Sequence, residues 1–182
     1  MKVNVCSGLL ESVQYHVSPH CDARPQETVI DMVVVHNISL PPGQFGGVAV
    51  SEFFCGQLDY STHSYFNEIA HLKVSTHLFI RRDGGIIQFV PFTLRAWHAG
   101  VSHFRGRERC NDFSIGIELE GTDAIPYEQK QYTQLVLVLK ELMRVYPDIT
   151  LDRIVGHSDI APERKTDPGE LFDWIYLRGL LA

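Results

Sequence analysis

The segment Val29–His36, with the sequence VIDMVVVH, constrains the fold more than any other part of the chain. It contains the apolar run Met-Val-Val-Val, and β-branched side chains favour an extended backbone because they pack well on a pleated surface. A run without polar alternation is typical of a strand that is covered on both faces. We therefore expect a sheet with a layer of other elements on each side.

Four further segments show strand patterns. Phe113–Glu120 (FSIGIELE) alternates, so that its apolar residues and its small or acidic residues point to opposite faces. Thr76–Arg82 and Ile86–Val90 are joined by a short Asp-Gly-Gly segment, which predicts a β-hairpin. Arg153–His157 (RIVGH) predicts a short strand.

The best helix pattern runs from Tyr132 to Tyr146, where apolar residues recur at spacings of three and four up to a proline. Shorter helices are expected at Val50–Leu58 and Gly169–Leu181, and residues 1–28 are expected to form an irregular N-terminal arm. No repeat or linker divides the chain, which predicts a single domain over residues 1–182. Strands and helices alternate along the chain and include a hairpin. The predicted fold class is therefore α/β (α+β), a mixed central β-sheet flanked by helices.

Charge and hydropathy argue against several classes of function. The chain has 16 Lys and Arg against 22 Asp and Glu, a formal charge of -6, which argues against binding to nucleic acid or to an anionic membrane. The first thirty residues lack the pattern of a signal peptide, and no apolar run is long enough to cross a membrane. The four cysteines form no C-x-x-C motif, so we expect free thiols. These features predict a cytoplasmic protein with no obligate protein partner.

Two histidines occupy equivalent positions in this layout. His36 and His157 each end an apolar strand and precede a loop rich in Pro or Gly, so both are expected at one rim of the sheet. A catalytic zinc takes three protein ligands and keeps an open position for water, and Asp159 or Asp167 could supply the third ligand. Each histidine alone also fits a hydrogen-bonded core residue, and Asp167 before a proline also fits a helix N-cap.

Two more residues suit hydrolytic chemistry. Glu118 lies in the middle of a predicted strand on a face with small neighbours, where a carboxylate could take a proton from water. The alternative is an ordinary solvated face, which Glu120 alongside would suit. Lys165 shares a loop with the aspartates, and its ammonium could stabilise an oxyanion, although most loop lysines are simply solvated.

Four stretches of sequence together resemble a known family. They are VVVHN at 33–37, RAWHAG at 95–100, GRERCNDFSIGIELEG at 106–121, and GHSDIAPERKTDPG at 156–169 followed by FDW at 172–174. In composition and order they are similar to the motifs of the zinc-dependent N-acetylmuramoyl-L-alanine amidases. The similarity is greatest to the cytoplasmic members that act on 1,6-anhydro-muropeptides, and it covers roughly residues 29 to 175.

The resemblance implies a fold, a substrate and a role for each matching residue. The implied fold is the mixed sheet shared with phage amidases and peptidoglycan-recognition proteins, and the implied substrate is an anhydro-muropeptide cut between N-acetylmuramic acid and L-alanine. One Zn²⁺ per chain would be bound by His36, His157 and Asp167, with Glu118 as acid/base and Lys165 stabilising the tetrahedral intermediate. The implied substrate-binding residues are Asn37, Lys73, Trp97 and Arg109. Lys73 departs from the family pattern, in which arginine is commoner, and lysine lacks the bidentate fork of arginine.

Three other functions remain compatible with the sequence. The chain could cut intact peptidoglycan, although the lack of a signal peptide argues against this. It could be a non-catalytic peptidoglycan-binding module, although such modules commonly lack a metal ligand. It could be a zinc peptidase, although no H-E-x-x-H motif is present.

Overall fold

A computed structural model describes all of residues 1–182 and contains a mixed sheet with helices around it, as the sequence predicts. The six strands of this sheet lie in the order β12-β5-β11-β6-β7-β3. The first four are parallel, β7 runs antiparallel to β6, and β3 pairs in parallel with β7. The strands span Gln14–Tyr15 (β3), Met32–Ile38 (β5), Leu78–Ile80 (β6), Ile86–Gln88 (β7), Ser114–Glu120 (β11) and Ile154–Gly156 (β12).

Helices of very different length surround the sheet. The α-helices are Ala49–Phe54 (α1), Ser64–Ile69 (α2), Gln129–Val145 (α3), His157–Ile160 (α4) and Trp174–Leu181 (α5). Short 3-10 turns span Tyr60–Thr62 (η1), Cys110–Asp112 (η2) and Leu151–Arg153 (η3). At the start of α3, the side-chain carbonyl of Gln131 accepts a hydrogen bond of 3.0 Å from the backbone N–H of Glu128. This contact satisfies one of the backbone amides that a helix start leaves without a partner.

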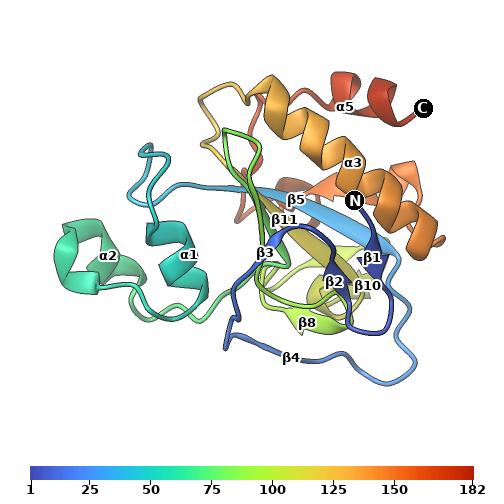
Figure 1. Cartoon of the computed structure of the whole chain (residues 1–182), viewed down its shortest axis with the longest axis horizontal. Helices are drawn as coiled ribbons and strands as arrows, with labels where there is room; N and C mark the ends of the chain where they lie inside the picture. The colour runs from blue at the N-terminus through green and yellow to red at the C-terminus, as the bar shows by residue number, and fades with distance from the viewer.

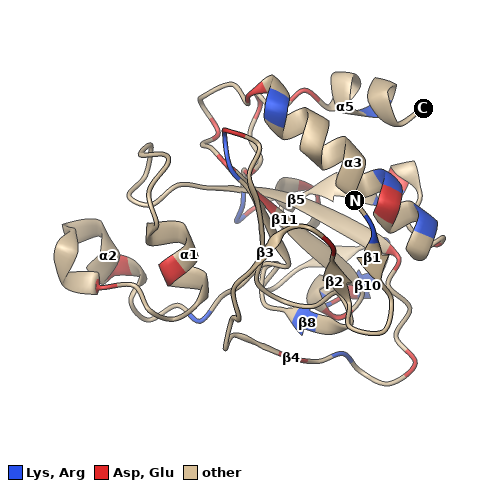
Figure 2. Cartoon of the chain, in the orientation of Figure 1, with Lys and Arg blue, Asp and Glu red and all other residues tan.

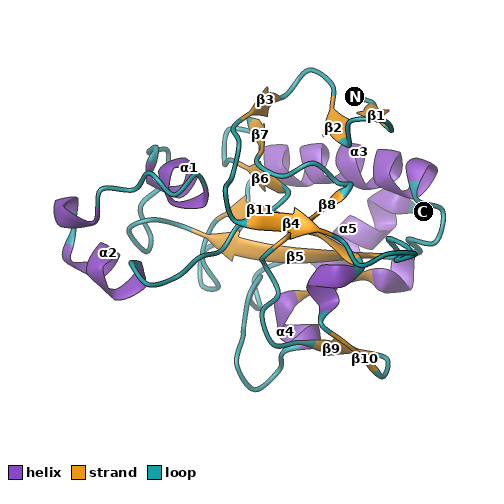
Figure 3. Ribbon diagram, turned by 90° about the horizontal axis from the view of Figure 1, so that it is seen from below, coloured by secondary structure: helices purple, strands orange, loops and turns teal.

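The central strands β5 and β11 are buried on both faces, as the apolar run predicts. Val33 and Val35 of β5 pack on one face into the largest core cluster, which contains residues of α3 and α5. Met32 and Val34 belong to a smaller cluster on the other face, which contains Ile160 of α4. Figure 1 shows α3 and α5 next to each other, and Figure 3 shows α3 and α4 on opposite sides of β5 and β11. His36 shares the α4 face, because alternate residues of a strand point the same way.

The helices α1 and α2 extend to one side of the sheet (Figure 1). Their apolar residues, among them Phe53, Phe54, Phe66 and Ile69, join a second core cluster. The helix expected at Val50–Leu58 is therefore present as α1, but it is shorter than predicted. The sequence did not predict α2, because only Phe66 and Ile69 of this helix are buried, and two apolar residues do not establish a helical period.

The N-terminal arm is more ordered than expected. The prediction that residues 1–28 are irregular is wrong in part, because β3 extends the main sheet and three more short strands pair elsewhere. Two of these strands pair with distant segments and two pair with each other, and each is too short to show a period in its own sequence. The remaining short strands are Val3–Asn4 (β1), Leu9–Leu10 (β2), Cys21–Ala23 (β4), Leu94–Ala96 (β8), His103–Phe104 (β9) and Arg107–Glu108 (β10).

Three expectations about element ends need correction. The strand expected from Val29 begins at Met32 and continues to Ile38, so His36 lies inside β5 rather than at its end. His157 is the first residue of α4 and not the last of a strand. The closing helix begins at Trp174, and its N-cap is Asp173, whose carboxylate accepts from Tyr176 N–H at 2.8 Å.

The structure contains charged side chains of both signs (Figure 2) and four free thiols. Figure 2 shows basic and acidic positions intermixed on α3. None of the helices is both long and apolar enough to cross a bilayer. All four cysteines are free, as predicted.

Candidate active site

Three side chains from distant parts of the chain converge at one rim of the sheet. The Nδ1 atoms of His36 and His157 are 3.0 Å apart, and Asp167 Oδ2 lies 3.0 Å from the first and 3.1 Å from the second. Parallel pairing of β12 with β5 brings the two histidines together, because β12 ends where α4 begins with His157. Asp167 reaches them from the loop between α4 and α5.

The chemistry of this trio fits a cation. His157 Nε2 lies 3.1 Å from the carbonyl oxygen of Ala99, which can only accept, so the ring proton is on Nε2 and Nδ1 presents a lone pair. Burial lowers the pKa of His36 to about 4, so this ring is neutral. Acceptor atoms facing one another at about 3 Å repel unless a cation lies between them. Tetrahedral zinc with bonds of about 2.0–2.1 Å places its ligand atoms about 3.3 Å apart, close to the distances found here.

The two alternatives weighed for the aspartates are resolved by their contacts. Asp159 does not face the histidines; its carboxylate accepts from the backbone N–H of Gly156 at 2.7 Å and so caps the start of α4. Asp167 does face them, and the interpretation of Asp167 as a helix cap is wrong because Asp173 occupies that position. The distinction could not be made from spacing, since the sequence shows no period around either aspartate; in the structure Asp159 lies in α4 and Asp167 in the loop that follows it.

Glu118 lies beside the histidines. It pairs in register with His36 across the parallel strands β5 and β11, the residue is only 9% exposed, and its Oε2 atom has no hydrogen-bond partner. Burial, and secondarily the charge of Asp167, raises the pKa of Glu118 well above its usual range, while Lys165 acts in the opposite direction. The interpretation of this strand face as solvated is wrong, because every residue of β11 is buried.

Glu120 has a structural role instead. Its two carboxylate oxygens accept from the backbone N–H groups of Gly46, at 2.6 Å, and Arg82, at 3.0 Å. It therefore ties the loop before α1 to the β6–β7 turn. Of the two strand glutamates, only Glu118 is left with an unpaired oxygen.

The first part of the loop that contains Asp167 is anchored by residues that precede this aspartate. The backbone N–H of Lys165 donates to Ala161 at 2.9 Å, and the guanidinium of Arg164 donates to the carbonyl oxygens of Ala99 and Val101 at 2.8 and 2.7 Å. Arg164 thus joins this loop to the segment that follows β8. Lys165 lies on the cavity wall with Glu118 and the candidate ligands.

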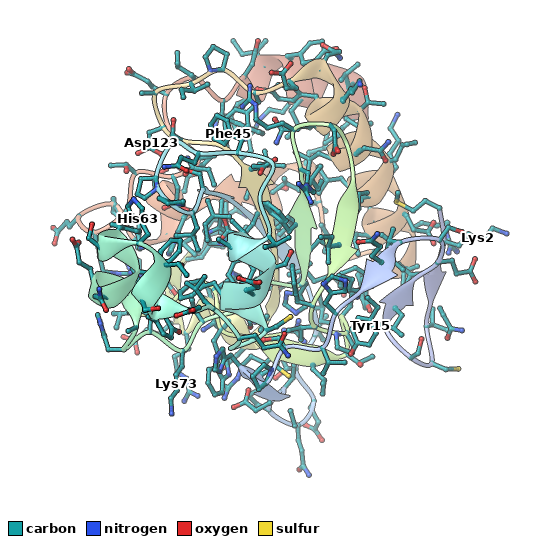
Figure 4. The ribbon with its side chains drawn as sticks, turned by 60° about the vertical axis from the view of Figure 1, so that its left-hand side comes forward. Lys2, Tyr15, Phe45, His63, Lys73 and Asp123 are labelled. Carbon is teal, nitrogen blue, oxygen red and sulfur yellow. The ribbon has the colours of Figure 1, made fainter.

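A cavity of about 660 Å³ opens over the trio. Asn37 lines it. The side-chain NH₂ group of Asn37 donates to Asp123 at 2.7 Å, and this contact does not involve the side-chain carbonyl oxygen. The opposite wall is apolar and comes from α1 and α2, including Phe53 and Tyr65. In Figure 4, Asp123 and His63, the residue that precedes α2, lie on the same side of the molecule.

The other three predicted substrate residues lie outside this cavity lining. Trp97 donates from its indole nitrogen to Asp22 at 3.1 Å. Arg109 has a side chain that is 70% exposed and lies 3.4 Å from Asp112. Lys73 is exposed and, in Figure 4, points away from the body of the protein. The structure therefore brings together the candidate ligands, Glu118, Lys165 and Asn37, and leaves these three apart from them.

One residue of the site was not identified from the sequence. His98 is buried, lines the cavity, and lies 2.9 Å from His36 through ring nitrogens. Burial, together with the neighbouring histidines and Arg24, lowers the pKa of His98 well below its ordinary value, so its ring is neutral. The small side chains on the Glu118 face of β11 were the available signal, because they imply that a bulky group covers that face, and His98 is that group.

Comparison with known proteins assigns the family. Residues 25–170 match the family described as N-acetylmuramoyl-L-alanine amidase. The chain is 58% identical over 175 residues to the 1,6-anhydro-N-acetylmuramyl-L-alanine amidase AmpD of Escherichia coli (strain K12), covering 96% of this chain and 95% of the relative. The chain therefore belongs to the N-acetylmuramoyl-L-alanine amidase family, as its motifs predicted.

Solved structures agree with this assignment. The fold matches a crystal structure of a selenomethionine derivative of AmpD with a TM-score of 0.96 and 54% identity, covering 100% of both chains. It also matches the amidase AmiD from E. coli in complex with anhydro-N-acetylmuramic acid-L-Ala-D-gamma-Glu-L-Lys. That match has a TM-score of 0.60 and 31% identity, and covers 86% of this chain and 60% of the other. The mixed sheet flanked by helices is thus the fold of these amidases.

Proposed function

We propose that this protein is a zinc-dependent amidase that cuts the amide bond between 1,6-anhydro-N-acetylmuramic acid and the L-alanine of a stem peptide. The observation that supports this most directly is the convergence of His36, His157 and Asp167 beside a buried carboxylate with an unpaired oxygen. The relatives named for this activity cover nearly the full length of the chain.

His36, His157 and Asp167 would hold one zinc ion, and they offer three ligand atoms within 4.8 Å of one another. A zinc ion in such a site acts as a Lewis acid that acidifies water and polarises an amide carbonyl. Three ligands from protein leave a position open, which distinguishes a catalytic site from a structural one.

Glu118 is the acid/base of the proposed reaction. Its unpaired oxygen accepts the proton of the attacking water, and the resulting carboxylic acid then protonates the leaving nitrogen of alanine. Burial raises the pKa of Glu118, which makes its carboxylate a stronger base towards water than an exposed glutamate. Proton transfer of this kind contributes about 10²–10⁴ in rate.

Lys165 stabilises the negative charge that develops on the carbonyl oxygen when the amide is attacked. It lines the cavity next to Glu118 and is held by its backbone bond to Ala161. A cation at this position acts most strongly in the transition state, where the oxygen has the largest charge.

The cavity binds the muramyl end of the substrate and the first residues of the stem. Asn37, fixed by Asp123, presents its carbonyl oxygen as an acceptor for a substrate N–H. Lys73, Trp97 and Arg109 lie outside the cavity and would contact only the more distant, anionic part of the peptide. Arg109 is suited to a carboxylate because its guanidinium can form two parallel hydrogen bonds.

The setting that best fits this substrate is recycling of cell-wall fragments in the cytoplasm, with consequences for β-lactamase induction. The whole chain would act as one domain without an obligate protein partner, since β3 of the N-terminal arm is part of the central sheet. The only partner required is the anhydro-muropeptide.

One experiment tests the proposal. Purified protein is incubated with anhydro-muropeptide, with and without a chelator, and the products are identified by mass spectrometry. We expect anhydro-N-acetylmuramic acid and free stem peptide, formed only without chelator. Activity that survives removal of all metal would contradict the zinc proposal, and release of peptide from intact sacculi at a comparable rate would contradict the choice of substrate.

A further inference from the structure

His98 has no part in the reaction proposed above, yet its buried ring contacts the candidate ligand His36. It follows β8, and its ring lies on the face of β11 that contains Ser114 and Glu118. Its Nδ1 atom lies 2.9 Å from His36 Nε2, and its Nε2 atom lies 3.2 Å from the hydroxyl oxygen of Ser114. That hydroxyl donates in turn to the carbonyl oxygen of Cys110 at 2.6 Å.

These contacts form a row of hydrogen bonds that ends at the carbonyl oxygen of Cys110. This oxygen determines which atom donates in each hydrogen bond of the row. The carbonyl oxygen of Cys110 can only accept, so the single proton of the Ser114 hydroxyl is used there. Ser114 Oγ must then accept from His98 Nε2–H. With the ring proton of His98 on Nε2, its Nδ1 atom presents a lone pair and accepts from His36 Nε2–H at 2.9 Å. The remaining nitrogen of His36, Nδ1, is left with a lone pair directed at His157 and Asp167.

Ala99, the residue after His98, forms a hydrogen bond with the second candidate ligand, His157. The carbonyl oxygen of Ala99 accepts from His157 Nε2–H at 3.1 Å, which leaves the lone pair of His157 on Nδ1. The backbone N–H groups of His98 and Ala99 both donate to one oxygen of Asn111, at 3.1 and 2.7 Å. Asn111 therefore holds the dipeptide in the position from which it contacts both histidines.

We propose that the dipeptide His98-Ala99 is a positioning element that sets the tautomer and the ring orientation of both candidate zinc ligands, His36 through a side chain and His157 through a carbonyl. This inference rests on the proposed zinc site. A ligand histidine whose second nitrogen is held by an acceptor binds metal without first changing its tautomer, and loss of such a partner typically costs about 10- to 100-fold in metal affinity.

The sequence of β11 is explained by the same arrangement. Ser114 orients His98, Gly116 makes room for it, and Glu118 faces the cavity. A Cβ atom on Gly116 would lie 2.5 Å from the imidazole Cγ of His98, so the ring can cover the strand only where that residue has no side chain. The alternation of small and acidic residues on this face thus accommodates the imidazole.

The tautomers can be measured directly in the wild-type protein. Long-range ¹H–¹⁵N NMR spectra distinguish protonated from unprotonated imidazole nitrogens. We expect the proton on Nε2 in His36, His98 and His157. A proton on Nδ1 of His98 would overturn the proposal, because the row of hydrogen bonds would then run in the opposite direction.

Variants test the consequence for metal binding. His98→Phe keeps a ring but removes the acceptor, and its zinc affinity, measured by competition with a chelator, should fall by about 10- to 100-fold. His98→Asn returns an oxygen near the position of Nδ1 and should recover most of this loss. Ser114→Ala frees His98 to exchange tautomers and should weaken zinc binding by up to about tenfold. Zinc affinities of His98→Phe and Ser114→Ala equal to that of the wild type would overturn the proposal.

The controls separate this inference from the proposed function. Thr76→Val removes another buried hydroxyl, one that donates to the carbonyl of Gly116 at 2.9 Å, and should leave zinc affinity unchanged. If His98→Phe does not fold, Ser114→Ala and the NMR spectra decide. If the wild-type protein itself binds no zinc, the proposed function fails, while the spectra still test the tautomers.

Discussion

The pKa of Glu118 depends mainly on the burial of its carboxylate. Its carboxylate is buried next to another acid, and one oxygen has no partner, so the folded state penalises its charged form. His98 is also buried, and its lowered pKa makes its ring neutral for the same reason. At the scale of single residues, burial therefore decides which groups of the site hold protons.

The first prediction concerns Glu118→Gln, which keeps the shape of the side chain and removes its basicity. We expect turnover of anhydro-muropeptide to fall by about 10²–10⁴, with bound zinc unchanged. Stability should be no lower than in the wild type, because glutamine has no charge to desolvate. Loss of zinc from this variant would show that Glu118 is a ligand, and full activity would show that the base lies elsewhere. The measurements are kcat, metal content and thermal unfolding.

A second prediction compares two glycines. Gly116→Ala would force a Cβ atom against His98, and we expect the free energy of unfolding to fall by about 1–3 kcal/mol. Gly179 in α5 has no atom within 4 Å of the corresponding position, so Gly179→Ala should stabilise the protein by up to about 1 kcal/mol. Urea denaturation measures both. Equal stability of Gly116→Ala and the wild type would contradict the close packing of His98 on β11.

At the scale of elements, the loop between α4 and α5 contains a candidate metal ligand and a helix N-cap. The sequence suggested either role for Asp167, whereas the structure assigns the two roles to different aspartates. Asp167 faces the histidines, and Asp173 begins the helix. The segment between them places a metal ligand and a helix start in succession. Each can therefore be removed without the other.

The third prediction uses that separation. Asp167→Ala should lose zinc and activity while the helix content measured by circular dichroism is retained. Asp173→Ala should keep zinc and lower the free energy of unfolding by about 0.5–2 kcal/mol, the usual cost of removing an N-cap. If Asp167→Ala instead melts α5 while retaining zinc, the two assignments are reversed.

A fourth prediction concerns the attachment of the N-terminal arm to α3. The carboxylate of Glu141 accepts from Val3 N–H at 2.7 Å and from Arg144 at 2.7 and 2.8 Å. The hydrogen bond with Arg144, above all, lowers the pKa of Glu141 from 4.5 to about 2. A lowered pKa in the folded state stabilises the protein above the unfolded pKa, and this contribution is lost as the pH falls from about 4.5 to about 2.

Glu141→Gln should accordingly be less stable than the wild type at pH 7, by about 1 kcal/mol, a value reduced because Arg144 is exposed to solvent. The difference should shrink towards zero at pH 2. Unfolding free energies measured across this range test the prediction. A difference that does not depend on pH would indicate lost packing rather than lost charge.

At the scale of the whole molecule, the site joins segments that are far apart in sequence. β5, the start of α4 and the following loop each supply one candidate ligand, so a bound ion connects them only in the folded state. A ligand that binds only the folded state adds about 2.7 kcal/mol at a free concentration of 100 times its Kd.

The fifth prediction follows from that linkage. A chelator should lower the Tm of the wild-type protein by roughly 5–11 °C, from about 2–4 °C per kcal/mol for a chain of this size. Asp167→Ala should show no response to the same chelator. A wild-type Tm that is unaffected by complete removal of metal would contradict the proposed zinc site. Differential scanning calorimetry with metal analysis provides the measurement.

Local sequence determined the regular elements of this protein wherever a pattern was long enough to have a period. The apolar run around Val33 and the alternation of Phe113–Glu120 predicted the two central strands, and the spacing from Tyr132 predicted α3. The family motifs predicted which residues would gather at the rim of the sheet. These signals succeed because burial on one or both faces imposes a repeat on consecutive residues.

Only the tertiary structure decided the contacts between distant segments. It distinguished Asp167 from Asp159, left Trp97 outside the cavity, and brought His98 against His36 across the face of β11. It also formed β3 by pairing two residues of the N-terminal arm with β7. None of these contacts produces a repeating pattern in the sequence. Each depends on which backbone group or side chain another part of the chain places within hydrogen-bonding distance.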